Sequence, residues 1–280
     1  MRGISRLRRM GARLGMDRRR AVETLDSKYE RRSPHAQNAL DLIPGWTGSF
    51  PENHALQAGE MALYSDPRVH WALDQYGPLD GASVLELGPL EGAHSYMLEQ
   101  RGAAEVLGIE ANKQAFLKCL VAKEILGLTR CRFLLGDFEK YLAETPRHFD
   151  IILASGVLYH MQNPVQVLDM MGRKCNALIL WTHYYDDDLL PADDPRRGPF
   201  SGGPTVYEHE GHNYTLYRRS YEQAWNTNSY CGGPDDTHYW MVRPEIEALC
   251  QRNGFNDIRV HFENADGVNG PSCLFYMRKT

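Results

Sequence analysis

Short apolar segments alternate with helical segments through the middle of this 280-residue chain. Strands are predicted at residues 83–87, 105–109, 131–135, 149–154 and 177–182, with two more at 258–262 and 273–277. Strands that alternate with helices form a parallel sheet covered on both faces. The last two segments are separated only by a polar turn region, which predicts an antiparallel hairpin at the edge of the sheet. The pattern therefore predicts an α/β fold with a mostly parallel sheet.

Helices are predicted between these strands. They cover residues 67–76, 93–101, about 112–126, 164–173 and 244–253. In the third of them Asn112 is the expected N-cap, and Phe116, Leu117, Leu120 and Val121 are expected to share the buried face.

Residues 186–242 interrupt the alternation. They contain Gly-Gly-Pro turns and many aromatic residues, and the stretch 205–219 has the pattern of a hairpin. An insertion of this length within a compact domain is usually a lid or a binding loop. We expect an aromatic-rich cap at 186–242, within a domain that covers 34–280 and follows a basic, disordered tail at 1–33.

Charge is divided unevenly along the chain. Residues 1–20 hold eight arginines and one acid, and the remainder holds 23 basic and 35 acidic residues. An acidic body argues against a broad nucleic-acid surface. The tail has a weak basic amphipathic pattern, so contact with an anionic surface and an organelle-targeting role both stay open.

The chain lacks the ~20-residue apolar stretch of a membrane span. Its N-terminus also lacks the apolar core of a secretory signal. The six cysteines form no Cys-x-x-Cys pair, and several lie in apolar segments, which is typical of buried thiols in a reducing compartment. These features predict a cytoplasmic protein, and the sequence does not indicate its oligomeric state.

Glycines and acids follow the first three predicted strands. Glu86, Gly88 and Gly92 surround the turn after the first strand, Glu110 ends the second, and Asp137 follows the third. Glycines allow a sharp turn and a close approach of the backbone to a ligand, and a carboxylate after the second strand typically accepts from ribose hydroxyls. The spacing is not the G-x-G-x-x-G of dinucleotide sites, which disfavours a nicotinamide-dependent oxidoreductase. An adenosine ligand with a positively charged end is favoured instead.

With these motifs the chain resembles the class I S-adenosylmethionine-dependent methyltransferases, clearly over residues 80–185 and in architecture over 243–280. The resemblance implies a Rossmann-like sheet of seven strands with an antiparallel C-terminal strand, and S-adenosylmethionine as the cofactor. It places Glu86, Gly88 and Gly92 around the methionine moiety and Glu110 on the ribose. It places Asp137 and Phe138 near the adenine, with Ser155 beside the methyl donor.

The fourth strand runs into Ala-Ser-Gly-Val-Leu-Tyr-His-Met-Gln-Asn-Pro at residues 154–164. In this fold the segment reaches the methyl-donor pocket, so Tyr159 and His160 are candidate catalytic residues. His183 ends the fifth strand and is the second candidate base. Packing of the turn by Tyr159 and His160, and simple solvation of His183, are the structural alternatives.

Acceptor contacts are expected from Tyr185, Asp186, Tyr239 and Trp240. The segment His209-Glu-Gly-His212 does not have the His-Glu-x-x-His spacing of zinc sites and no cysteine is near it, so no metal is predicted.

Residues 154–164, the helix at 116–127 and residues 243–260 also resemble the tRNA wobble-uridine carboxymethyltransferases. Those enzymes hold a carboxylated cofactor with basic residues, and Ser272 stands where an arginine of that family is expected. We therefore expect ordinary S-adenosylmethionine and a small-molecule acceptor methylated on O, N or S. A tRNA-modifying methyl- or carboxymethyltransferase and a non-catalytic S-adenosylmethionine-binding protein remain the alternatives.

Overall fold

A computed structural model describes residues 28–222 and 232–280. The chain divides into two compact units, Met1–Leu42 and Ile43–Thr280. In the first unit, helix α2 (Ala36–Asp41) is capped by His35, whose Nδ1 accepts from the backbone N–H of Gln37 at 3.1 Å. Most of the predicted basic tail, residues 1–27, lies outside the described residues.

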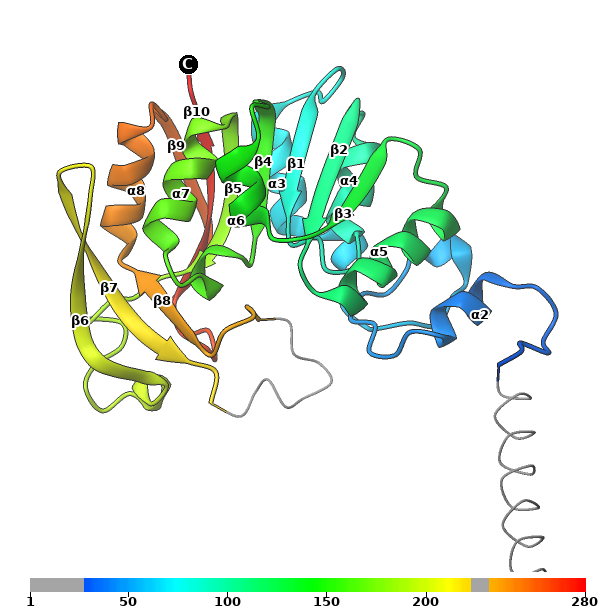
Figure 1. Ribbon diagram of the computed structural model, residues 1–280, viewed down its shortest axis with the longest axis horizontal. Coiled ribbons are helices and arrows are strands. Elements are labelled where there is room, and N and C mark those ends of the chain that lie inside the picture. Colours follow the sequence, from blue (N-terminus) through cyan, green and yellow to red (C-terminus); the bar gives the residue numbers. More distant parts are fainter. Residues whose placement is uncertain (1–27, 223–231) are drawn as a thin grey trace, which may run out of the picture. The chain divides into compact units, whose positions relative to one another are not determined.

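A seven-stranded sheet forms the centre of the second unit, in the order β3-β2-β1-β4-β5-β10-β9 (Figure 1). Its strands are β1 (Ser83–Leu87), β2 (Glu105–Glu110), β3 (Cys131–Leu135), β4 (Phe149–Ser155), β5 (Cys175–His183), β9 (Asp257–Asn264) and β10 (Ser272–Arg278). The first five pair in parallel, and β10 runs antiparallel to both β5 and β9. The predicted fold class, with its antiparallel C-terminal strand, is confirmed. The last strand lies inside the sheet, whereas β9 forms the edge.

Helices cover both faces of this sheet. They are α3 (Pro67–Tyr76), α4 (Ala93–Gln100), α5 (Lys113–Leu126), α6 (Phe138–Glu144), α7 (Pro164–Arg173) and α8 (Arg243–Arg252). One apolar core joins the sheet to α6, α7 and α8, and the other joins it to α3, α4 and α5. The described part of the second unit also contains the short 3₁₀ helices η1 (Glu52–His54), η2 (Leu63–Ser65), η3 (Leu158–His160) and η4 (Pro195–Arg197). Across the two described ranges, no helix has both the length and the apolar character needed to cross a lipid bilayer.

The buried face of α5 differs from the prediction. Asn112 caps the helix as expected, by accepting from the backbone N–H groups of Gln114 and Ala115. However, the helix buries Ala115, Cys119 and Ala122, while Leu117 and Leu120 remain 50% and 40% exposed. The helix is apolar on more than one face, and its small residues allow the closer approach to the sheet.

Five cysteines of the described chain are buried free thiols, namely Cys119, Cys131, Cys175, Cys250 and Cys273. This agrees with the predicted buried thiols, and Cys231 lies outside the described residues.

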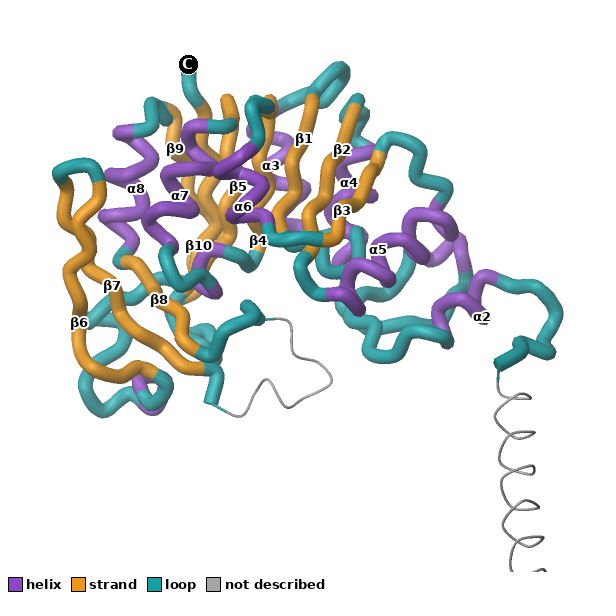
Figure 2. Tube along the Cα trace, viewed as in Figure 1, coloured by secondary structure: helices purple, strands orange, loops and turns teal. Residues whose placement is uncertain are grey.

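Residues 186–242 add a second, three-stranded antiparallel sheet of β6 (Phe200–His209), β7 (His212–Ser220) and β8 (Thr237–Met241), as Figure 2 shows. The predicted hairpin at 205–219 is confirmed by the pairing of β6 with β7. Leu216 pairs with Met241, and both pack into the main core. Tyr217 pairs with Trp240 and Arg219 with His238, so these four side chains share the opposite face.

Candidate active site

A cavity of about 420 Å³ lies at the carboxyl ends of β1, β2 and β4. Its volume falls within the usual range of small-molecule sites. Six of the predicted site residues line it: Gly88, Glu110, Phe138, Ser155, Tyr159 and His160. Tyr221 and residues 232–236 from the inserted segment line it as well.

The glycine turn after β1 is held in a left-handed conformation. Gly88, Leu90 and Gly92 have φ values of 63°, 56° and 76°. The N–H of Gly88 donates to the carbonyl of Ile109 at 2.9 Å, which ties the turn to the neighbouring strand. A Cβ on Gly88 would make only an ordinary contact of 3.5 Å with the side chain of Val157, so the positive φ rather than lack of space favours glycine here.

Glu110 fixes the other side of this turn. Its Oε2 accepts from the N–H of Leu90 at 3.0 Å, and its Oε1 accepts from the N–H of Asn112 at 2.8 Å. Burial raises the pKa of Glu110, and the backbone hydrogen bonds oppose that rise. Each carboxylate oxygen can still accept a second hydrogen bond, so Glu110 has the capacity to bind a diol at the cavity wall.

Glu86, Gly92 and Asp137 lie around the cavity without lining it. Glu86 is buried, accepts from the hydroxyl of Ser95, and has its pKa raised by burial. Gly92 precedes α4, and Asp137 is exposed and caps α6 by accepting from the N–H of Glu139 at 2.9 Å. Phe138, the next residue, does line the cavity.

The segment after β4, Gly-Val-Leu-Tyr-His at residues 156–160, turns sharply and brings two ring side chains to the cavity. Gly156 has a φ of 81°, and its N–H donates to the carbonyl of Trp181 at 3.0 Å. This turn leads into η3, which carries Tyr159 and His160 into the cavity wall. Their rings lie 4.0 Å apart between centroids.

His160 contacts a residue that lies 61 positions later in the chain. Its Nδ1 is 2.5 Å from the hydroxyl oxygen of Tyr221, and the same oxygen accepts from the N–H of Gly233 at 2.9 Å. Burial lowers the pKa of His160 to about 3, with the charges of His238, His183 and Arg219 adding to the effect. The imidazole is therefore neutral at neutral pH.

His183 lies behind Tyr159 and does not line the cavity. Its Nδ1 is 3.1 Å from the carbonyl oxygens of Gly270 and Pro271, so the Nδ1–H group donates a hydrogen bond to them. The ring stacks on Trp240 at 4.9 Å and meets Tyr159 edge-on at 4.7 Å. Burial lowers the pKa of His183 to about 4.

The four predicted acceptor residues occupy different places. Trp240 is a buried residue of β8 that stacks on His183, and Tyr239 packs on the opposite face of β8. Tyr185 is buried and lines a second cavity of about 200 Å³. Asp186 accepts from the N–H groups of Asp188 and Leu189 and so begins a turn. The ring of Trp240 lies 6.1 Å from that of Tyr159, between centroids.

Tyr221 and Arg219 are residues near the site that the sequence did not single out, whereas His238 belongs to the segment His238-Tyr239-Trp240 that the resemblance places on the substrate side. Tyr221 and His238 stack at 4.1 Å, and Arg219 faces His238 across β7 and β8. The only signal for Tyr221 and Arg219 was the density of aromatic and histidine residues in the insertion, because their positions depend on how that insertion folds back.

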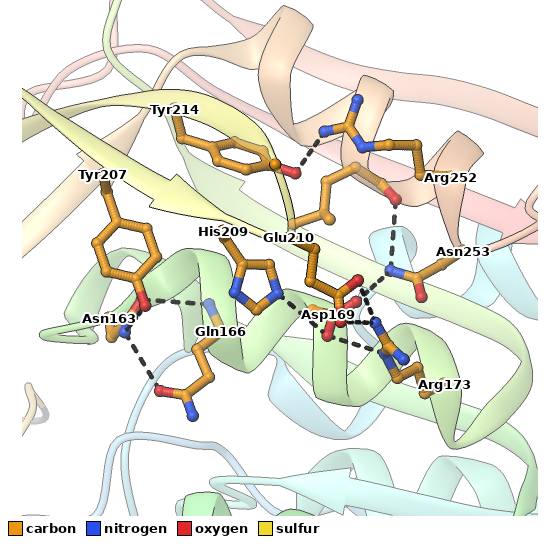
Figure 3. A network of polar contacts seen from close by, with 12 residues as sticks. Asn163, Gln166, Asp169, Arg173, Tyr207, His209, Glu210, Tyr214, Arg252 and Asn253 are labelled. Atoms are coloured by element: carbon orange, nitrogen blue, oxygen red, sulfur yellow. Dashed lines mark hydrogen bonds and ion pairs between the residues drawn. The ribbon is translucent and has the colours of Figure 1, made fainter.

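The His209-Glu210-Gly211-His212 segment forms the turn of the hairpin. His209 Nε2 lies 3.2 Å from Asp169 Oδ2, and Arg173 forms ion pairs with both Asp169 and Glu210 (Figure 3). The Arg173 guanidinium already supplies the positive charge beside these carboxylates. The network fastens the hairpin to α7, and the prediction that the chain holds no metal stays a prediction.

Comparison with known proteins finds a methyltransferase domain in the central part of the chain. Residues 78–186 match a family model described as a methyltransferase domain. A tRNA U34 carboxymethyltransferase from Photobacterium profundum is 30% identical over 155 residues, which are 54% of this chain and 47% of that protein. A ubiquinone biosynthesis O-methyltransferase from Leptothrix cholodnii is 28% identical over 112 residues, which are 40% of this chain and 46% of that protein. The chain thus spans about half the length of these curated relatives.

Among solved structures, the N-terminal domain of EvdMO1, determined in the presence of S-adenosylhomocysteine and D-fucose, superposes with a TM-score of 0.65. That similarity covers 88% of this chain and 95% of the EvdMO1 domain, at 22% identity, and it shows the same fold. Residues 78–186 thus match a methyltransferase domain, and they lie within a seven-stranded sheet whose C-terminal strand is antiparallel.

Proposed function

We propose that this protein transfers a methyl group from S-adenosylmethionine to an O, N or S atom of a small-molecule acceptor. The cavity at the strand ends carries this proposal. The described residues that line it include Glu110, Asp235 and Asp236 and no lysine or arginine. A cleft with this charge suits a ligand that carries a sulfonium and an ammonium group.

Each part of S-adenosylmethionine would have a counterpart among the residues that line the cavity. Glu110 would accept from the ribose hydroxyls, while the backbone from Gly88 to Leu90 would approach the chain that links ribose and sulfonium. Phe138 would form an apolar wall beside the adenine, and Ser155 would lie at the methyl-donor end. When bound, the cofactor supplies an electrophilic methyl group.

Tyr159 and His160 would form the boundary with the acceptor. If Nδ1 of His160 donates to the Tyr221 oxygen, Nε2 is left to accept a hydrogen bond from the acceptor. A pKa of about 3 makes His160 a weak base, so its main work would be to orient the nucleophile. His183 would support Tyr159 through its edge-on contact rather than act as a base.

Residues 186–242 would serve as the cap over the acceptor. Tyr221 and residues 232–236 come from this segment and line the cavity beside His160. A cyclic acceptor fits the many aromatic rings around Tyr159, and the EvdMO1 domain solved with D-fucose gives a sugar as one example to test.

Modification of tRNA is the second candidate, because the tRNA U34 carboxymethyltransferase of Photobacterium profundum is 30% identical over the aligned part. Two observations favour the small molecule. Ser272 is buried at the start of β10, paired with His183, where an arginine would be expected to hold a carboxylated cofactor. The acidic body also offers little attraction to phosphates.

Calorimetric titration with S-adenosylmethionine, S-adenosylhomocysteine and carboxylated S-adenosylmethionine tests the cofactor. We expect the first two to bind and the carboxylated form to bind more weakly. Incubation with methyl-labelled cofactor and separate small-molecule and tRNA fractions then tests the acceptor. Label in tRNA, or preference for the carboxylated cofactor, would favour the second candidate, and tight binding without any transfer would favour a non-catalytic protein.

A further inference from the structure

Among the residues that the structure describes, three buried polar atoms without hydrogen-bond partners lie on one face of the inserted sheet. These atoms are Arg219 Nε, His238 Nε2 and Trp240 Nε1. Arg219 faces His238 across the paired strands, and Trp240 follows His238 by two residues. Buried polar atoms are almost always satisfied in folded proteins, so such a group points to a ligand.

Arg219 carries the charge of this group. Its guanidinium lies 5.1 Å from the Trp240 ring and 5.7 Å from the Phe200 ring, and burial lowers its pKa. Within the described ranges no ion pair involves Arg219. The charge of Glu222 favours its protonated form without forming an ion pair, and Asp236 already accepts from the Ser220 hydroxyl and the Tyr221 N–H. A largely buried cation without a paired anion is costly, and an anionic ligand would offset that cost.

His238 can adapt to such a ligand. Its Nδ1 donates to the carbonyl of Asp236 at 3.1 Å, so in the neutral ring Nε2 is an acceptor. Burial lowers the pKa of His238 to about 4. A bound anion would favour the imidazolium and convert Nε2 into a donor.

The group adjoins the reaction site. The His238 ring lies 6.2 Å from the His160 ring and stacks on Tyr221, whereas Trp240 lies 6.1 Å from Tyr159. A ligand held by Arg219 would therefore extend toward Tyr159 and His160, where the acceptor atom is expected.

We propose that Arg219, His238 and Trp240 form a subsite for an anionic group, a carboxylate or a phosphate, carried by the methyl acceptor. The inference rests on the proposed function and narrows its substrate to acidic small molecules. The anion would accept hydrogen bonds from Arg219 and Trp240 and hold the acceptor against Tyr159.

The test uses the full chain saturated with S-adenosylhomocysteine. The anionic probes are 4-hydroxybenzoate and D-glucuronate, and their neutral matches are 4-hydroxybenzamide and methyl D-glucoside. We expect at least one anionic probe to bind about tenfold tighter than its neutral match in calorimetry, because hydrogen bonds to charged groups typically contribute a factor of this order or more. The same probe should raise the His238 pKa measured by NMR.

Arg219→Gln should abolish the preference for the anion and leave S-adenosylhomocysteine affinity unchanged. Arg219→Lys keeps the charge and should retain part of the preference. Arg218→Gln is the matched control, since Arg218 is the exposed neighbour on β7 that contacts Ser201 and Thr237. It should behave like the wild type.

The outcomes separate the two proposals. Failure of the wild type to bind S-adenosylhomocysteine contradicts the proposed function itself. Normal cofactor binding without preference for either anionic probe, or a preference that survives in Arg219→Gln, overturns the subsite. If Arg219→Gln weakens only the binding of carboxylated S-adenosylmethionine, then Arg219 holds an anionic group of the methyl donor and not of the acceptor, which also overturns the proposed subsite.

Discussion

Replacing Glu91, in the turn before α4, should destabilise the protein more than an exposed change on α5. Its side chain is fully buried and lies 3.0 Å from the ammonium of Lys118, which is 8% exposed. Its oxygens also accept from the N–H groups of Thr47 and Gly48 at 2.6 and 2.9 Å. Glu91→Ala leaves a buried ammonium unpaired and two amides unsatisfied, so we expect a loss of about 3–5 kcal/mol in the free energy of unfolding.

Urea unfolding followed by circular dichroism measures this loss. The double variant Glu91→Ala/Lys118→Met removes the unpaired charge as well, so it should be less destabilised than the sum of the two single variants. Glu124→Ala, an exposed change on α5, should stay within about 0.5 kcal/mol of the wild type. A loss below about 1 kcal/mol for Glu91→Ala, or strict additivity in the cycle, would refute the assigned role of the ion pair.

Three further outcomes are expected. Glu110→Gln should weaken S-adenosylhomocysteine binding about tenfold in calorimetry, whereas Glu105→Gln, at the surface end of the same strand, should not. Tyr221→Phe should lower kcat about tenfold with little change in cofactor KM in a methyl-transfer assay, because it removes the partner that orients His160. Burial lowers the pKa values of His160, His183 and His238 below the 6.5 of the unfolded chain. As the pH falls, these residues therefore take up protons in the unfolded chain before they do so in the folded protein. The folded state keeps its full stability above pH 6.5 and loses stability as the pH falls toward 4. His183→Asn should flatten that decline in urea midpoints measured between pH 7 and 4.5.

The sheet could be predicted from the sequence because its strands are short, apolar and separated by clear turns. The same reasoning located Glu110, Ser155 and Tyr159, since each stands at or just after the carboxyl end of a parallel strand. It misjudged α5, where Leu117 and Leu120 look like core residues but face outward. Periodicity does not select a face when several faces are apolar.

The residues that the insertion adds to the site could not be predicted from the sequence. Tyr221 reaches His160 from 61 residues away, and no local pattern specifies that contact. Likewise, Tyr185 and Asp186 follow β5 as predicted, but Tyr185 lines the second cavity and Asp186 begins a turn, so neither lines the main cavity. Such positions depend on the path of the insertion, which is set by packing between distant segments.

The position of β10 has a consequence for the order of folding. This strand lies between β5 and β9, and both of its neighbours are synthesised before it. Until β10 arrives, the nascent sheet presents open edges along β5 and β9 with unpaired backbone groups, and such edges invite pairing between molecules. Its inner residues, Cys273 to Met277, are almost completely buried once it docks. The sheet is thus closed by a late, non-local step, and the interval before that step is when the chain is most exposed to aggregation and to chaperones.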